Sequence, residues 1–549
     1  MSDGWPGDWR TNRRELLHSA LLAATTPWLS GCGESTPPLE GELLSPSFDL
    51  GHRIRDGFRP PPPNGAPEEV EVLIVGGGIA GLSAGWRLKR AGIENFRILE
   101  MEPVPGGTSR SGKSPLTAYP WGAHYVPFPN EQNRALLQLL EEMGAVSRQS
   151  DGTWQPAESV ACRTPQERLF AGGRWVEGLF PGQLATEEDA RQWERFEAEI
   201  NHWIDWRDAE GRPAFTIPVD RCSPAEEVAQ LDALTMTDWL NGIGVTSNLI
   251  HWYVDYCCRD DYGLNVDQTS AWAGIFYFAS RKASAAEEEA PLLTWPAGNG
   301  AIVDFLSNLL ASQLRTGQAV IGIRPGNQRT KVSAFDLQSE TVKEFSAERV
   351  IFAAPQFMAP YLIPSLNEER RSAIREFQYG SWVVANLHLS QRPSEDNYPL
   401  SWDNVLFESL SLGYVVATHQ LGSDFGPTVW TWYYPLCDEI PAEARKRLLN
   451  STWEEWTAIV FKDLDAAHPQ LTKYVTKIDV MRWGHAMVQP RPGFLTREAR
   501  KQARQPLGPI HFAGTDLSGL ALMEEAFYHG LRAAEEVLAA ANVEFNTYL

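Results

Sequence analysis

The sequence predicts an α/β fold in which a nucleotide-binding sheet of Rossmann type is interrupted by two long insertions. Three observations lead to this prediction. A short apolar strand and a glycine-rich turn precede a helix near residue 76, and a second strand-turn-helix unit follows near residue 510. Two further strand-like runs lie between them, at 319–323 and 348–352. Because these pieces are far apart in the chain, the chain must leave the sheet and return to it.

Length, charge and cysteine usage exclude several classes of protein. At 549 residues the chain exceeds one ordinary core, so we expect at least two domains. The composition, with 43% hydrophobic and 21% charged residues, is globular. The net charge of −22 argues against nucleic acid or an anionic membrane surface as electrostatic partners and weakly favours a cationic substrate. The six cysteines form no CxxC pair or Cys/His cluster, so we predict no metal site.

The first 32 residues contain a pair of adjacent arginines, then an apolar run, then a cysteine. Arg13 and Arg14 precede a weakly apolar run, 16–29, that is shorter than the roughly 20 residues of a spanning helix. The run ends in Leu29-Ser30-Gly31-Cys32. These features resemble a twin-arginine export signal with a bacterial lipobox. The resemblance implies a lipid anchor at Cys32 that holds the protein on the periplasmic or extracytoplasmic side of a bacterial envelope membrane. An ordinary amphipathic helix is the alternative.

The turn after the first strand has the spacing of a dinucleotide site. Gly76, Gly78 and Gly81 form GxGxxG between the strand at 71–75 and the following helix. The first glycine permits the tight turn, the second lets a pyrophosphate approach the backbone, and the third lets the helix pack on the strand. A second strand ends at Glu100, 19 residues after Gly81, where a carboxylate can accept ribose hydroxyls. The predicted nucleotide-binding residues here are Gly76, Gly78, Ile79, Ala80, Gly81 and Glu100.

Further segments point to a flavin dinucleotide. Leu99-Glu100 is followed, after five residues, by Gly106-Gly107, then by Tyr119-Pro120-Trp121-Gly122-Ala123-His124. Near the end of the chain lie Ile510 to Asp516 and Met523-Glu524-Glu525-Ala526. Together these segments resemble the superfamily of flavin amine oxidases, phytoene desaturases and protoporphyrinogen oxidases. Thr108 stands where many relatives have arginine, although Arg110 lies two residues later, and Asp516 stands where the family usually has glutamate.

The resemblance assigns roles to these positions. It implies FAD as cofactor, with Val320 giving backbone contacts to adenine and Gly122, Ala123 and His124 passing beside the flavin. Gly514 and Asp516 hold the ribityl-pyrophosphate, and the helix that begins at Met523 faces flavin N1 and O2. A helix N-terminus there stabilises the negative charge that hydride transfer leaves on the ring. Gly106 and Gly107 complete the predicted FAD site.

The substrate end departs from the monoamine and polyamine oxidases. Those enzymes place a lysine on the strand that corresponds to 382–389, and this stretch has none. A tyrosine of monoamine oxidases is Leu522 here. His485 falls where monoamine oxidases carry the cysteine that tethers their flavin, so we expect noncovalent FAD. His485 is the candidate catalytic residue, in contact with flavin or substrate; a structural histidine satisfied by backbone is the alternative.

The domain boundaries follow from these segments. The FAD-binding domain comprises 69–130, 293–355 and 480–545, and a mixed α+β substrate domain comprises 131–292 and 356–479. The signal at 1–32 and a proline-rich extended tether at 33–68 precede them. Periodicity predicts helices at 131–143, 187–206 and 442–464 and strands at 382–389 and 429–434.

Three functions are compatible with the sequence. The favoured one is an FAD-dependent oxidoreductase that moves hydride from a small organic substrate, preferably an amine, to flavin N5 and passes electrons to oxygen or a quinone. The second is a C–C desaturase or isomerase of the phytoene desaturase type. The third is a non-catalytic flavin-binding protein. Nucleic acid is not expected as a partner.

Overall fold

The computed structural model describes residues 38–286, 291–394, 397–423 and 425–549. Arg13, Arg14 and Cys32 lie outside these residues. The chain divides into two compact units, 1–40 and 41–549, and the second contains both large sheets. No helix in the described ranges is long and apolar enough to cross a lipid bilayer.

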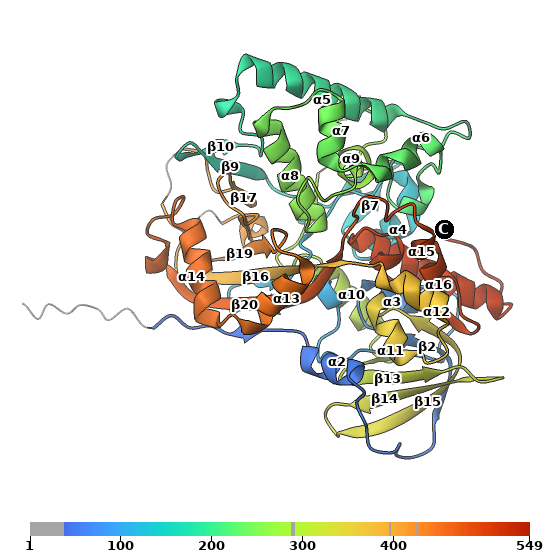
Figure 1. The fold of residues 1–549 in the computed structure, drawn as a ribbon. Helices are drawn as coiled ribbons and strands as arrows, with labels where there is room; N and C mark the ends of the chain where they lie inside the picture. Colours follow the sequence, from blue (N-terminus) through green and yellow to red (C-terminus); the bar gives the residue numbers. More distant parts are fainter. Residues whose placement is uncertain (1–37, 287–290, 395–396, 424) are drawn as a thin grey trace, which may run out of the picture. The chain divides into compact units, whose positions relative to one another are not determined.

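A seven-stranded sheet forms the nucleotide-binding layer. Its order is β12-β3-β2-β15-β14-β13, with β21 also paired to β15. β15 pairs in parallel with both β2 and β21, so segments from the two ends of the chain meet in one layer (Figure 1). The Rossmann-like part of the predicted fold is therefore confirmed. The strands are β2 Glu68–Val75, β3 Phe96–Leu99, β12 Leu314–Arg315, β13 Gln318–Arg324, β14 Thr330–Asp336, β15 Thr341–Phe352 and β21 Ile510–Phe512.

Two helices that begin at the predicted glycine motifs pack against each other beside this sheet. α3, Ile79–Arg90, follows the turn after β2, and α16, Met523–Ala540, follows the segment after β21. Their close approach depends on Gly530, because a Cβ there would lie 2.0 Å from Ser83 Oγ and 2.2 Å from the Ala80 carbonyl oxygen. A glycine in this helix interior therefore serves packing rather than flexibility.

The second sheet has eight strands and belongs mainly to the two insertions. Its order is β1-β20-β16-β19-β18-β17-β9-β10. The central pairs β16-β20 and β16-β19 are antiparallel. β20 runs through residue 480, so residues 480–488 lie in this sheet. The strands are β1 Leu43–Leu44, β9 Glu167–Ala171, β10 Arg174–Glu177, β16 Tyr379–Leu389, β17 Asp403–Leu406, β18 Tyr414–Val416, β19 Thr428–Pro435 and β20 Val475–Val488.

Helices of the first insertion complete the mixed α+β part of the fold, as predicted. Apolar residues of these helices share one core, and Figure 1 shows them grouped together. The main helices are α5 Glu187–Asp205, α7 Met236–Gly242, α8 Asn248–Tyr262 and α9 Ala271–Ala279. The helix predicted at 131–143 is shorter, with α4 at Arg134–Glu142.

The long helix predicted at 442–464 is wrong, because the structure has two helices there. α13 is Pro441–Asn450 and α14 is Trp453–Leu464. Thr452 forms a capping box with Glu455, in which each side chain accepts a hydrogen bond from the other residue's backbone N–H. Ser451 is extended, with ψ 137°. The local cap starts a new helix where apolar spacing alone indicates continuity.

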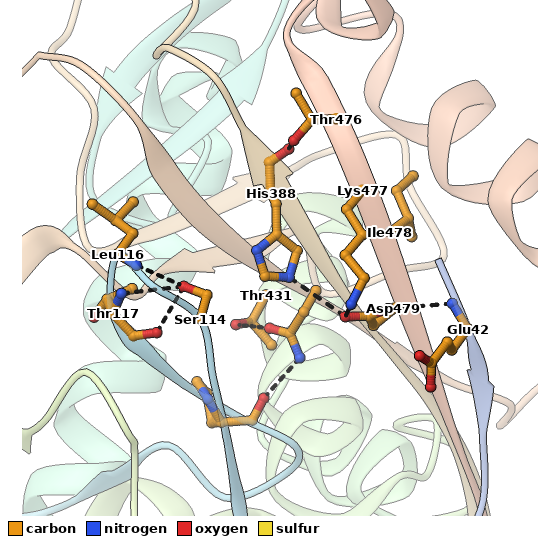
Figure 2. A network of polar contacts seen from close by, with 12 residues as sticks. Glu42, Ser114, Leu116, Thr117, His388, Thr431, Thr476, Lys477, Ile478 and Asp479 are labelled. Atoms are coloured by element: carbon orange, nitrogen blue, oxygen red, sulfur yellow. Dashed lines mark hydrogen bonds and ion pairs between the residues drawn. The ribbon is translucent and has the colours of Figure 1, made fainter. Parts of the chain in front are cut away.

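Part of the segment predicted to be an extended tether, from residue 41 onward, is instead a folded part of the second unit. β1 pairs in parallel with β20, and α2, Phe48–Arg55, buries Leu50. Figure 2 shows how the strand is fixed: Glu42 N–H donates to Asp479 Oδ1 at 3.2 Å, and Asp479 also lies 2.7 Å from Lys477 Nζ. His388 Nε2 is 3.6 Å from the same carboxylate. The prolines of this segment indicate an extended tether, but apolar residues between them, such as Leu50, are buried in the fold.

Candidate active site

A cavity of about 1340 Å³ connects the predicted nucleotide turn with the second sheet. Its walls include the turn after β2, the N-terminus of α16, strands β16 and β20, and helix α2. The volume exceeds the roughly 300–1,000 Å³ of ordinary small-ligand pockets. It can therefore hold a dinucleotide together with a substrate.

The glycine turn has the geometry that its spacing predicts. Gly76 has φ 105°, and a Cβ at Gly81 would lie 1.9 Å from the Gly76 carbonyl oxygen. At Gly78, by contrast, a Cβ would meet no atom of the described chain within 4 Å, because this face opens into the cavity. Ile79 and Ala80 line the same wall at the N-terminus of α3. The turn thus offers backbone N–H groups and open space to a phosphate.

Glu100 lines the cavity beside the glycine turn and is held by backbone donors. Its Oε2 accepts the Gly77 N–H at 2.7 Å and its Oε1 accepts the Glu102 N–H at 2.8 Å. Each oxygen keeps another lone pair for a hydroxyl. Burial, opposed by these two hydrogen bonds, raises the pKa of Glu100. Val320 of β13 lines the cavity as well.

The second glycine pair and Arg110 fit an anion. Gly106 and Gly107 have φ 116° and 57°, and the Gly106 N–H donates to the Gly77 carbonyl at 2.8 Å. Arg110 lines the cavity, stacks over Trp483 at 5.0 Å and lies 3.4 Å from Glu102. Within the described chain, its buried Nε has no hydrogen-bond partner. Arg110 is thus available in place of an arginine at position 108.

The segment from Tyr119 to His124 is fixed against the second sheet. A Cβ at Gly122 would lie 2.2 Å from the Thr108 carbonyl oxygen, and the Ala123 N–H donates to that oxygen at 3.1 Å. Tyr433 OH donates to the Gly122 carbonyl at 2.9 Å, and its ring stacks on His124 at 4.7 Å. Burial lowers the pKa of His124 to about 4, so this imidazole is neutral at pH 7. Gly122, Ala123 and His124 all line the cavity.

The terminal motif lies on the same cavity. Gly514 has φ 129°, and a Cβ there would meet no described atom within 4 Å. Asp516 Oδ2 accepts hydrogen bonds from the Gln356 N–H at 2.8 Å and from Tyr379 OH at 2.7 Å. Met523 opens α16 at the cavity wall. One carboxylate oxygen of Asp516 is therefore already committed to protein donors.

His485 opens onto the cavity from β20. Its ring lies 4.4 Å from the ring of Phe357 and 5.8 Å from that of Tyr379. Desolvation by the surrounding protein, and then the positive charge of Arg445, lower its pKa to about 4. The imidazole is neutral at pH 7 and is a weak proton acceptor. The neutral imidazole of His485 is better suited to contact a ring or a carbonyl oxygen than to accept a proton.

A group of buried charges, which the sequence analysis did not identify, lines the inner end of the cavity. Arg281 lies 3.2 Å from Asp261, and Tyr125 OH donates to Asp261 at 3.3 Å. Burial, and then the neighbouring Asp261, raise the pKa of Asp260 to about 7. Burial likewise raises the pKa of Glu524 to about 7. The sequence signal was a pair of adjacent aspartates ending the otherwise mostly apolar helix α8.

β16 contributes no charged side chain to the described cavity lining, although Tyr379 at its start lines the cavity. Trp382 and Val384 line the cavity there, and Leu522 lines it from the start of α16.

The residues present fit FAD at this site: a phosphate turn, an acid for ribose, an unpartnered arginine N–H and two open glycine faces. Comparisons with known proteins agree. The family model described as flavin containing amine oxidoreductase matches residues 79–538. Amine oxidase [flavin-containing] B of Bos taurus is 23% identical over 495 residues, which cover 86% of each chain. Oxidoreductase PigB of Serratia sp. is 22% identical over 299 residues, 50% of this chain but only 42% of PigB.

A solved structure has the same fold. Wild-type putrescine oxidase bound to putrescine superimposes with a TM-score of 0.65 at 17% identity, covering 86% of this chain and 100% of that one. Because the family model spans most of the chain, this protein belongs to the flavin-containing amine oxidoreductase family and is a flavin-dependent, amine oxidase-like oxidoreductase.

Proposed function

We propose that the protein oxidises the carbon–nitrogen bond of a small amine with noncovalently bound FAD. The flavin supplies the acceptor for a hydride from the carbon beside nitrogen. The substrate loses that hydride and one nitrogen-bound proton, and the resulting imine is hydrolysed to a carbonyl compound and a free amine or ammonia. Oxygen or a quinone takes the two electrons from the reduced cofactor.

The carboxyl groups at the inner end of the cavity are the observation that favours an amine. Asp260, Asp261 and Glu524 carry three acidic functions there, and Arg281 is paired with one of them. An ammonium ion entering this end would neutralise buried negative charge. It must then lose a proton before its carbon can release hydride. A carboxyl group with a pKa of about 7 is suited to accept that proton near neutral pH.

The alternative substrate is a polyene, processed by a desaturase or isomerase. The apolar wall of Val384 and Leu522 favours it, since both side chains can contact hydrocarbon. Asp260 and Glu524 oppose it, because an apolar chain beside them would bury their carboxyl groups without offering a hydrogen-bond partner, whereas Asp261 is already paired with Arg281.

Anaerobic reduction of the flavin separates the two. The purified yellow holoprotein is mixed without oxygen with primary amines, secondary amines and polyenes in turn. Bleaching by an amine and not by a polyene is the expected result. Bleaching by polyenes alone would replace the proposal with C–C chemistry, and no bleaching by any compound would favour a flavin-binding protein without this activity.

We further propose export by the twin-arginine route and a lipid anchor at Cys32. The support is the order Arg13-Arg14, apolar run and Leu29 to Cys32, which lies outside the described residues. This route exports folded proteins and so suits a protein that takes up its cofactor before export. Replacing both Arg13 and Arg14 with lysine should leave the protein in the cytoplasm, as cell fractionation would show.

A further inference from the structure

The charged residues that line the cavity come from different elements of the fold. The acidic lining residues follow β3, lie near the end of α8, or belong to the terminal motif and the start of α16, namely Glu100, Glu102, Asp260, Asp261, Asp516 and Glu524. We define the outer mouth as the part lined by α2, α11 (Ala359–Leu362), α12 (Glu368–Arg375), α13 and residues 482–485 of β20. Its described lining contains six basic residues besides His485 and no acid: His52, Arg55, Arg371, Arg375, Arg445 and Arg482.

The outer mouth is open to solvent and partly apolar. Tyr361 is 47% exposed, Ile440 67% and Leu449 47%, and all three line it. The protein as a whole has a net charge of −22. A basic opening on an acidic protein therefore reflects a local arrangement of charges rather than the composition.

Most of these arginines already have partners. Arg55 lies 2.7 Å from Asp56, and Arg375 lies 2.6 Å from Glu368. Arg371 donates to backbone carbonyls, including that of Pro360 at 2.9 Å. The guanidinium groups of these three arginines therefore already have partners within the protein.

Arg445 and Arg482 differ because both are half-buried and neither has an ion pair within the described chain. Among the described residues, the single hydrogen bond of Arg445 runs from Nη1 to the Tyr379 carbonyl, at 3.4 Å. Arg482 donates to Ser45 Oγ at 2.9 Å and to the Leu448 carbonyl at 2.8 Å. Desolvation lowers the pKa of both guanidinium groups. Asp49 offsets part of this effect at Arg482, and no carboxylate does so at Arg445 within the described chain. Two half-buried cations without an ion pair are costly unless a ligand supplies negative charge.

Their surroundings favour a carboxylate with an apolar body. Arg445 Cγ lies 3.9 Å from the position of a Cβ on Gly484, directly beside His485. The Arg482 guanidinium lies 5.8 Å from the centre of the Phe48 ring. A guanidinium presents a planar fork that binds a carboxylate through two hydrogen bonds. The neighbouring aromatic and aliphatic side chains can contact a hydrocarbon chain.

We propose that the outer mouth is a binding site for an organic carboxylate with an apolar body, held by Arg445 and Arg482. This site goes beyond amine oxidation, which requires no anion, and it is independent of the substrate oxidised at the inner end.

Calorimetric binding to the flavin-loaded protein tests the proposal without turnover. The probe is octanoate, and the control probes are acetate, which lacks the apolar body, and octanol, which lacks the charge. Octanoate should bind more tightly than either. Arg445→Gln and Arg482→Gln should each weaken octanoate at least about tenfold, the scale of a charge-assisted hydrogen bond. Arg445→Lys, which keeps the charge but not the fork, should have intermediate affinity.

Lys446→Gln is the matched control. Lys446 precedes Arg447 on α13, is paired with Glu443 at 2.6 Å and lies outside the cavity lining, so its loss should leave octanoate affinity unchanged. Equal affinity in wild type and in the Arg445→Gln, Arg482→Gln double variant would overturn the proposal. Loss of bound flavin from either single variant would also overturn it, because the arginines would then serve the cofactor.

Discussion

Gly78 and Gly81 belong to one turn, yet the structure predicts that substitutions at the two positions fail in different ways. Gly78 has φ −74° and ψ −179°, a backbone conformation that any residue adopts. A Cβ there would meet only the cavity. At Gly81 a Cβ would lie 1.9 Å from the carbonyl oxygen of Gly76. Gly78→Asp should therefore fold without cofactor, whereas Gly81→Ala should damage the fold.

The magnitudes follow from these contacts. A carboxylate at position 78, about 4 Å from one phosphate charge, is repelled by about 4 kcal/mol at an effective dielectric constant of about 20. That energy corresponds to an affinity loss of about 1000-fold for FAD. The free energy of unfolding of the Gly78→Asp apoprotein should lie within about 1 kcal/mol of that of the wild-type apoprotein, because the substitution breaks no contact. Gly81→Ala should lower the free energy of unfolding by about 1–3 kcal/mol or more, because the backbone at Gly76 or Gly81 must move to make room for the new Cβ.

Two measurements on purified protein check this pair. Flavin content, read from the absorbance of the released cofactor, should be lost in Gly78→Asp. Denaturant unfolding of the apoproteins should show near-normal stability for Gly78→Asp and a clear loss for Gly81→Ala. Wild-type flavin content in Gly78→Asp would refute the placement of the pyrophosphate at this turn.

Four further predictions concern the cofactor link, the buried acids and the anchor. His485→Ala should change the flavin spectrum or the turnover more than it changes stability. Acid precipitation of the wild type should release the yellow cofactor into the supernatant. Colour kept in the wild-type pellet but not in that of His485→Ala would instead establish a covalent histidyl link. Burial raises the folded pKa of Glu525 to about 8 from 4.5, so the folded protein holds a proton that the unfolded chain loses, and stability falls as pH rises between these values. Glu525→Gln keeps an acceptor for the Val219 N–H. In denaturant unfolding, this variant should therefore be more stable than wild type by up to about 3 kcal/mol at pH 7, and no more stable than wild type below pH 4. Equal stability of variant and wild type at both pH values would count against a raised pKa for Glu525. Anaerobic flavin reduction by an amine should accelerate as pH rises through about 7, where Asp260 ionises, and Asp260→Asn should be slower and lose the Asp260 step from the profile; an unchanged profile would remove Asp260 from proton transfer. Cys32→Ser should release the protein from membranes, and absence of labelled fatty acid on the wild type would dismiss the anchor.

The nucleotide half of the site is predictable from sequence because its chemistry depends on local backbone. The spacing of Gly76, Gly78 and Gly81 predicts a tight turn, and the close approach of Gly81 to the Gly76 carbonyl that such a turn requires is present in the structure. The position of Glu100 follows from the length of one helix and one strand. Such features need no knowledge of distant side chains.

The substrate half is not predictable in the same way. Asp261 and Arg281 lie on opposite sides of α9 in sequence and meet only through packing of the helical layer. The environment of His485 depends on Arg445 from α13 and on His52 from α2, in a segment whose composition indicates a tether. Tertiary packing therefore brings Asp261 and Arg281 together and sets the surroundings of His485, neither of which a sequence motif indicates.

The central claim is that the carbon beside an amine nitrogen gives its hydride to the bound flavin. The most direct test is the rate of anaerobic flavin reduction by an amine from the panel that bleaches the holoprotein, compared with the same amine deuterated at that carbon. We expect reduction to be severalfold slower with the deuterated amine, because the carbon–hydrogen bond breaks in the step observed. Reduction by polyenes but by no amine would contradict it.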